Sequence, residues 1–95
     1  DLDNIINGED IKAPDEIDLQ YAVASALVGR AIRAQSSAHS ATIYGNILNY
    51  ASCFPQREMG VMLVSDMHRA IGNDLFELDE FASWADSIAD LILYD

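Results

Sequence analysis

The stretch from residue 54 to residue 72, FPQREMGVMLVSDMHRAIG, has the strongest helical pattern in the chain. Its apolar residues recur at helical spacing: Met59, Met62, Leu63, Ala70 and Ile71, with Val61 and Val64 widening the same face. Pro55 suits the first helical position, where a missing N–H costs no hydrogen bond. Gly72 can provide a left-handed cap at the end. The pattern predicts a central helix here.

A second long helix is predicted from residue 15 or 16 to about residue 35. Acids crowd its start, and Arg30 and Arg33 lie near its end, which suits the helix dipole. Its predicted apolar stripe comprises Ile17, Tyr21, Ala24, Val28 and Ala31, with Leu27 and Ile32 beside it. Several small residues leave this helix narrow, so another helix can approach closely. Gly29 weakens an isolated helix by roughly 1 kcal/mol relative to Ala, so we expect it to have a packing reason.

Two further helices complete the predicted core. One covers about residues 38–52, is capped by a nearby serine, and has an apolar stripe of Ile43, Ile47, Leu48, Ala51 and Phe54. On it, Tyr44 and Tyr50 are expected to bury their rings and keep their hydroxyls in water. The other covers about residues 80–94, with Asp79 as N-cap and a stripe of Phe81, Trp84, Ala85, Ile88, Leu91 and Ile92. A short helical turn over 1–7 is predicted to stop at Gly8.

These elements predict an all-α fold, a compact bundle of about four main helices with one core. We expect the 95 residues to form a single helical domain, 1–95. The sequence contains no convincing alternating strand pattern and no apolar run long enough to span a membrane. Because it begins with Asp1 rather than Met, we expect it to be the C-terminal part of a longer chain.

Charge is distributed unevenly along the chain. The net charge is −11, with balances of −6 over residues 1–18, +2 over 19–73 and −7 over 74–95. A surface for duplex nucleic acid needs Lys and Arg to neutralise phosphates, and anionic membranes attract basic segments, so neither partner is expected. The acidic ends can be solvated helix faces or can meet a basic surface of a neighbour. Cys53 is the only cysteine, which favours a reducing cytoplasm.

The sequence offers few residues for catalysis or metal binding. Cys53, His39 and His68 are not spaced as a zinc motif. Ser65, Asp66 and His68 have the residue types of a catalytic triad but fall within one helix, where they point in different directions. No stretch matches the phosphate loop GxxxxGK[ST]. We therefore expect no catalytic residue and no metal site in this chain, and no ATP hydrolysis by it alone.

Arg57 is the one candidate binding residue. It lies at the start of the central helix, where a cation is badly placed relative to the helix dipole. It can pair with Glu58 or another nearby acid, as an ordinary surface arginine does. It can also serve an anionic group that comes to the helix start.

Two segments, IDLQYAVASALVGRAIRA and NILNYASCFPQREMGVMLVSDMHRAI, resemble the helical region that follows the ATPase core in MoxR-like AAA+ ATPases of bacteria and their phages. The resemblance covers most of residues 15–93. It implies a non-catalytic lid domain that packs over a nucleotide and contacts neighbouring subunits of a homo-oligomeric ring. ATP and magnesium would be bound by the ATPase core of the same chain. A lid helix in this family often begins with an arginine that senses the γ-phosphate, and Arg57 resembles that residue by position.

The sequence leaves a second interpretation open. The chain can be a free-standing acidic interaction or regulatory protein of phage or bacterial origin that binds a basic surface. A small enzyme is a third interpretation, which the missing catalytic constellation disfavours.

Overall fold

We analysed a computed structural model of the chain, which describes residues 2–9, 11–72, 74 and 78. Four helices lie in this part of the chain, α1 (Leu2–Ile6), α2 (Ile17–Ala34), α3 (Ser40–Ala51) and α4 (Arg57–Ile71). All regular structure among the described residues is helical, which confirms the predicted all-α bundle. The helix predicted over 80–94, with its Asp79 cap and Trp84 stripe, lies outside the described residues.

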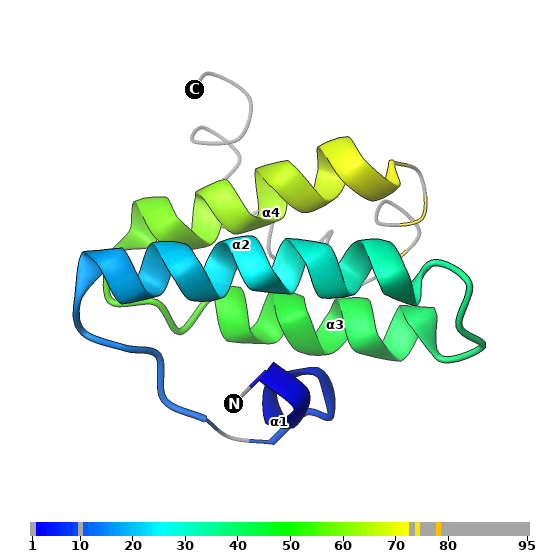
Figure 1. Ribbon diagram of the computed structural model, residues 1–95, viewed down its shortest axis with the longest axis horizontal. Coiled ribbons are helices and arrows are strands. Elements are labelled where there is room, and N and C mark those ends of the chain that lie inside the picture. The colour runs from blue at the N-terminus through cyan, green and yellow to red at the C-terminus, as the bar shows by residue number, and fades with distance from the viewer. Residues whose placement is uncertain (1, 10, 73, 75–77, 79–95) are drawn as a thin grey trace.

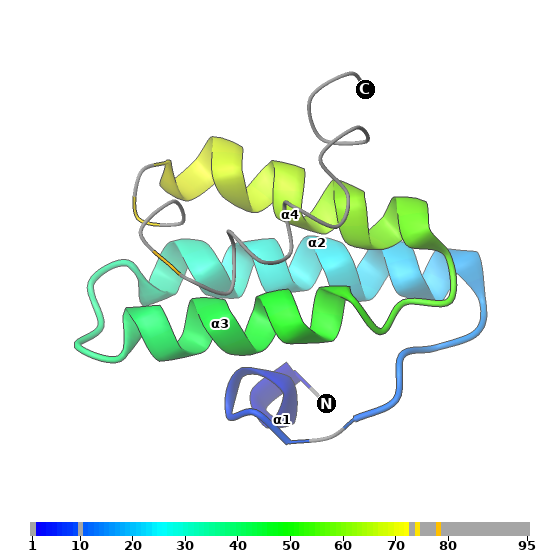
Figure 2. The same cartoon turned by 180° about the vertical axis from the view of Figure 1, so that it is seen from behind.

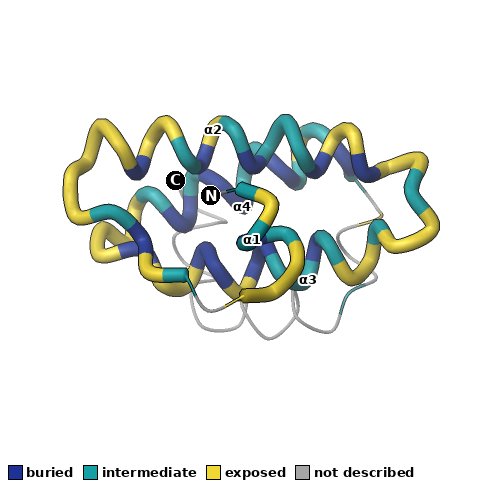
Figure 3. The backbone as a smooth tube through the Cα atoms, turned by 60° about the horizontal axis from the view of Figure 1, so that its bottom comes forward, coloured by how far each residue is buried: buried dark blue, intermediate teal, exposed yellow. Residues whose placement is uncertain are grey.

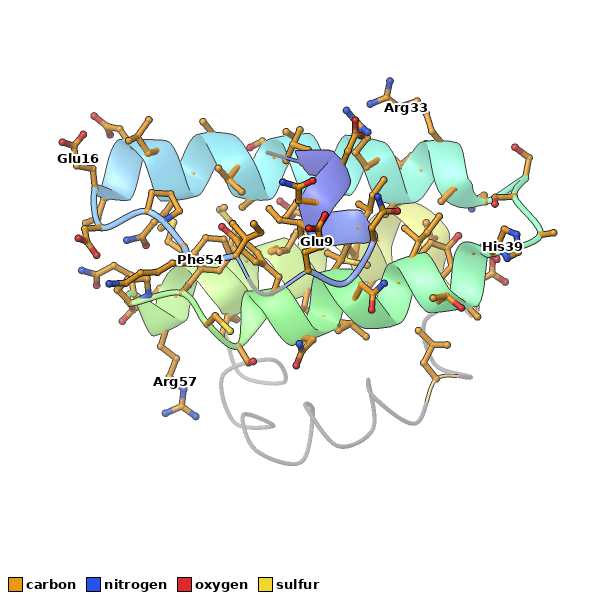
Figure 4. All side chains as sticks on the ribbon, turned by 90° about the horizontal axis from the view of Figure 1, so that it is seen from below. Glu9, Glu16, Arg33, His39, Phe54 and Arg57 are labelled. Atoms are coloured by element: carbon orange, nitrogen blue, oxygen red, sulfur yellow. The ribbon has the colours of Figure 1, made fainter. Side chains whose placement is uncertain are left out.

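The three long helices lie side by side, and α1 crosses them on one side (Figures 1 and 4). Helices α2 and α4 run in the same direction and α3 runs in the opposite one, as the colour order shows from both sides (Figures 1 and 2). The most extensive contact between helices joins α2 and α4. Consequently the first turns of α2 and α4 lie at the same end of the bundle.

The core is formed by the inward faces of all four helices. Its fully buried large side chains are Leu27, Tyr44, Ile47, Leu48, Leu63, Val64 and Met67. The predicted stripes of α3 and α4 are mostly confirmed, because most of their residues are buried in this core. Met59 and Met62 are partly buried and pack against it. No helix in the described residues is long and apolar enough to cross a membrane.

The stripe predicted for α2 was partly wrong. The buried residues of this helix are Gln20, Ala24, Leu27, Ala31 and Ala34, while Ile17, Tyr21 and Ile32 are exposed. Apolar or small residues occupy most positions around α2, so periodicity alone could not choose between adjacent faces. The buried face includes Gln20, whose Nε2 donates to the carbonyl oxygen of Asp15 at 3.1 Å. This bond connects the helix to the segment that precedes it.

Helix α1 is attached to the bundle through its C-terminal end. Gly8 has a φ of 86°, and the N–H groups of Gly8 and Glu9 donate to the carbonyls of Ile5 and Asn4. This is the Schellman arrangement, so the predicted stop at Gly8 is confirmed. The carbonyl of Ile6 accepts a hydrogen bond from Nδ2 of Asn46 on α3 at 3.0 Å. A side chain forty positions later in the sequence therefore satisfies one of the free carbonyls at the helix end.

Tyr44 and Tyr50 are both buried, as predicted for their rings. The prediction for the Tyr44 hydroxyl was wrong, because that atom is buried and has no hydrogen-bond partner within the described structure. Burial raises the pKa of Tyr44 above its usual value, and the negative charge of Asp74 raises it further. The inward position of Tyr44 on α3 places the whole side chain, hydroxyl included, in the core.

Candidate functional site

The candidate site is the start of α4, where Arg57 is the first helical residue (Figure 4). The prediction that Pro55 is the first helical residue was wrong, because the helix begins two residues later, at Arg57. Pro55 precedes the N-cap, Gln56, whose φ and ψ of −93° and 110° are extended. A proline two residues before the helix still restricts the entry of the chain, because its ring fixes φ and limits the residue before it.

The turn before Arg57 is anchored by aromatic packing. Phe54 is buried, and its ring meets that of Tyr50 edge to face, with centroids 5.2 Å apart and planes at 79°. Such pairs contribute about 0.5–1.5 kcal/mol beyond their burial. The backbone N–H of Cys53 donates to the carbonyl of Tyr50 at 2.9 Å. The chain between α3 and α4 is therefore held against the end of α3.

Gly60 brings the first turns of α4 close to α3. A β-carbon at this position would lie 2.4 Å from the carbonyl oxygen of Ala51, the last residue of α3. Only glycine permits this approach without a shift of backbone. Sequence analysis missed this role, although a glycine inside a strongly periodic helix is a signal for close backbone contact. Gly60 and Phe54 together fix the backbone position of Arg57 at the start of α4.

The Arg57 side chain is exposed and points away from the bundle (Figure 4). The same end of the bundle carries the start of α2, where Asp15 and Glu16 precede the helix and Asp18 lies in its first turn. These three acids are exposed, and α4 itself continues with exposed Glu58. Acids at helix starts are favourable with respect to the helix dipole, whereas Arg57 is not. Arg57 is therefore unfavourably placed with respect to the dipole of α4.

This geometry presents one guanidinium from a rigid helix start. A guanidinium binds carboxylate or phosphate oxygens through its planar fork, and such charge-assisted hydrogen bonds are the stronger ones in proteins. The arrangement can therefore bind an anionic group brought by another molecule or domain.

The other candidate residues are not brought together. His39 and Cys53 lie just outside opposite ends of α3, a helix whose twelve residues span about 18 Å. Oδ1 of Asp66 pairs with Nη2 of Arg69 at 3.3 Å, one turn along α4. The described residues contain no group of three potential metal ligands.

Comparisons of the sequence with protein-family models and with curated proteins, and of the structure with solved structures, gave no significant match.

Proposed function

We propose that the chain is a non-catalytic helical lid domain that packs over a nucleotide held by an ATPase core, as in MoxR-like AAA+ ATPases. In this role Arg57 contacts phosphate oxygens, most strongly when the γ-phosphate is present. ATP and magnesium belong to the core, and neighbouring subunits of a cytoplasmic homo-oligomer contact the bundle. Two observations support the proposal: the sequence resemblance over most of residues 15–93 and the helical bundle itself.

The observation that carries the proposal is the placement of Arg57. It is exposed, it is the first residue of α4, and it points out of the bundle (Figure 4). Its backbone is fixed by the buried Phe54 anchor and by the contact of Gly60 with Ala51. An arginine whose backbone is fixed and whose guanidinium projects from the domain is positioned to bind a phosphate that approaches from outside the domain.

The test is ATP turnover by the full-length protein carrying Arg57→Ala. A hydrogen bond to a charged group contributes about 1.5–3 kcal/mol, so turnover should fall on the order of tenfold or more. Arg57→Lys should restore it only in part, because an ammonium lacks the planar fork. Arg33→Ala is the matched control, since Arg33 is also exposed but lies at the far end of α2 (Figure 4).

Circular dichroism should show that all three variants keep the wild-type helix content. Unchanged turnover in Arg57→Ala, or an equal loss in Arg33→Ala, rejects the sensor role. The gene's reading frame gives a second test, because a Walker A motif encoded upstream of Asp1 is required for a lid.

An acidic interaction protein is the second candidate function. The observation that favours it is the exposure of Asp15, Glu16 and Asp18 together at the start of α2. A start codon directly before Asp1, together with salt-sensitive binding to a basic protein, would support this function instead.

A further inference from the structure

Helix α1 lies over both α2 and α3 on one side of the bundle (Figure 4). Ile5 is the buried residue of this helix. Nη1 of Arg30 on α2 donates to Oδ1 of Asp3, and Nδ2 of Asn46 on α3 donates to the carbonyl oxygen of Ile6 at 3.0 Å. We call the surface of α2 and α3 that lies under α1, and that Arg30 and Asn46 mark, the α1 seat.

Helix α1 is the element that leaves the bundle most easily. A helix of five residues is not stable by itself, so α1 is helical only while it is docked. Asn7, Gly8 and Glu9, which follow it, are exposed (Figure 3), and the extensive contact between α2 and α4 does not involve α1. Segments with few buried contacts open locally at a lower free energy than the whole domain.

Opening of α1 uncovers apolar surface beside two hydrogen-bond donors. Apolar residues share a side of each helix with the marker residue, at spacings of three, four or seven: Val23 and Ala26 with Arg30 on α2, and Ile43 and Tyr50 with Asn46 on α3. Val23 and Ile43 are partly buried and pack against the core. Once α1 has left, the α1 seat can therefore bury an apolar side chain of another segment.

Arg30 is only partly satisfied by α1. Its Nη1 reaches Asp3, but its Nε is buried and has no hydrogen-bond partner in the described structure. A guanidinium can hold both oxygens of a carboxylate through two parallel hydrogen bonds. A buried donor without an acceptor weakens the docking of α1. A carboxylate that reaches Nε as well would therefore bind Arg30 better than Asp3 does.

The present occupant shows which chemistry the α1 seat accepts. Asp3 precedes by three residues the carbonyl that Asn46 binds, and buried Ile5 lies between them. The net charge is −6 over residues 1–18 but +2 over residues 19–73, which include both helices of the seat. The charge of the seat is thus complementary to an acidic helix.

We propose that α1 is a displaceable strap, and that the α1 seat is a docking surface for the C-terminal end of an acidic amphipathic helix of another protein. The partner supplies a carboxylate to Arg30, a free helix-terminal carbonyl to Asn46 and an apolar residue in place of Ile5. While docked, α1 inhibits this binding, because a short tether gives it an effective concentration in the millimolar range. The proposal does not depend on the lid function, since it uses neither Arg57 nor a nucleotide.

The probe is a fluorescein-labelled synthetic peptide of residues 1–9 that carries Asp3→Glu, whose longer side chain can reach two donors. Its binding to the 95-residue chain is measured by fluorescence anisotropy. Asp3→Asn in the chain weakens the strap and leaves the seat intact, so the peptide should bind about twofold to fivefold more tightly than to the wild type. Ile5→Ala in the chain should strengthen binding on the order of tenfold or more, because it removes the buried anchor of the strap.

A second set of variants tests the role of Arg30. Arg30→Gln, added to Ile5→Ala, should remove most of the gain, and a peptide with Asp3→Asn should bind more weakly than the peptide with Asp3→Glu. Asp66→Asn and Arg69→Gln are the matched controls, because this ion pair lies on α4, outside the α1 seat. Amide chemical shifts should change at Arg30 and Asn46 when the peptide binds. Circular dichroism checks that every variant stays helical.

Four results would overturn the proposal. Absence of saturable binding to the Ile5→Ala chain at millimolar peptide removes the docking surface, and equal affinity of that chain and the wild type removes the strap. Equal binding of the two peptides, or no loss with Arg30→Gln, removes the recognition of a carboxylate. A dimer of the chain formed by exchange of α1 between copies, seen by sedimentation velocity, would assign the seat to a second copy instead of another protein. None of these results bears on ATP turnover, so the lid proposal is decided by its own test.

Discussion

The carbonyl oxygen of Ala51 occupies the space next to Gly60, only 2.4 Å from where a β-carbon at position 60 would lie. Real β-carbons essentially never come so close to another atom, and the atom in the way belongs to the backbone. The end of α3 and the second turn of α4 thus touch through a glycine. This contact fixes the backbone position of the candidate residue Arg57, three residues earlier.

Gly60→Ala should therefore destabilise the protein. Alanine improves helix propensity by roughly 1 kcal/mol, but overpacking against a backbone oxygen typically costs about 1–3 kcal/mol. Gly29→Ala is the matched control within α2, where the added atom meets open space. It should stabilise by up to about 1 kcal/mol. Urea unfolding at concentrations where the chain is monomeric measures both. The same sign of change in the two variants would contradict the structure.

Asn46→Ala should release α1 from the bundle. The variant loses the hydrogen bond from Asn46 to the carbonyl of Ile6, which contributes about 0.5–1.5 kcal/mol. Amide hydrogen exchange should speed up over residues 5–9 and stay slow in α2 and α4, because α1 opens as a local unit. Asn49→Ala, at an exposed position on the same helix, should leave exchange in α1 unchanged. Equal effects in the two variants would show that Asn46 does not hold α1.

Tyr44→Phe should leave stability unchanged or raise it by on the order of 1 kcal/mol. The substitution keeps the buried ring and removes a hydroxyl that has no hydrogen-bond partner within the described structure. Tyr21→Phe is the control, since Tyr21 is exposed and its hydroxyl is solvated in both states. A thermal or urea midpoint that drops in Tyr44→Phe would reveal a partner for the hydroxyl.

The same tyrosine predicts how stability depends on alkaline pH. Burial, and secondly the charge of Asp74, raises the pKa of Tyr44 above its usual value of 10.0. Burial, and secondly charge repulsion from Cys53, raises the pKa of Tyr50 as well. Below pH 10 these tyrosines are protonated in both the folded and the unfolded state, so their contribution to the free energy of unfolding is complete. Above it the unfolded chain ionises first and binds fewer protons, so the free energy of unfolding falls as pH rises.

Tyr44→Phe should accordingly lose less stability than the wild type between neutral pH and pH values above 10. Urea unfolding at both pH values measures the difference. Tyr50 is still present in the variant, so part of the alkaline loss should remain. A variant whose stability falls as steeply as that of the wild type would show that Tyr44 ionises equally in both states.

The ion pair between Arg30 and Asp3 should contribute little. Nη1 of Arg30 lies 2.5 Å from Oδ1 of Asp3, but the two side chains are 30% and 65% exposed. Exposed ion pairs contribute about 0.2–1 kcal/mol to stability. A double-mutant cycle with Asp3→Asn and Arg30→Gln measures the coupling, with Asp66 and Arg69 as a comparison pair on α4. The coupling should shrink as salt is added. A salt-independent coupling well above that range would mean that the pair is shielded from solvent.

The sequence by itself determined which of the described segments are helical. Periodic apolar residues, acids near the start of α2 and glycines after α1 and α4 are local features, and local hydrogen bonding and capping act on them within a few residues. The central helix, its end at Gly72 and the stop at Gly8 followed from such features. Arg57 could also be selected from sequence, because a cation at a helix start conflicts with the dipole whatever the fold.

The tertiary structure decided which face of each helix is buried and which contacts hold the helix ends against neighbouring helices. In α2 the apolar and small residues surround most of the helix, so only packing against α4 and α3 determined that Leu27 is inside and Tyr21 outside. The contacts of Gly60 with Ala51 and of Asn46 with Ile6 join residues from different helices. No local pattern specifies such pairs, because they depend on how whole helices approach one another in space.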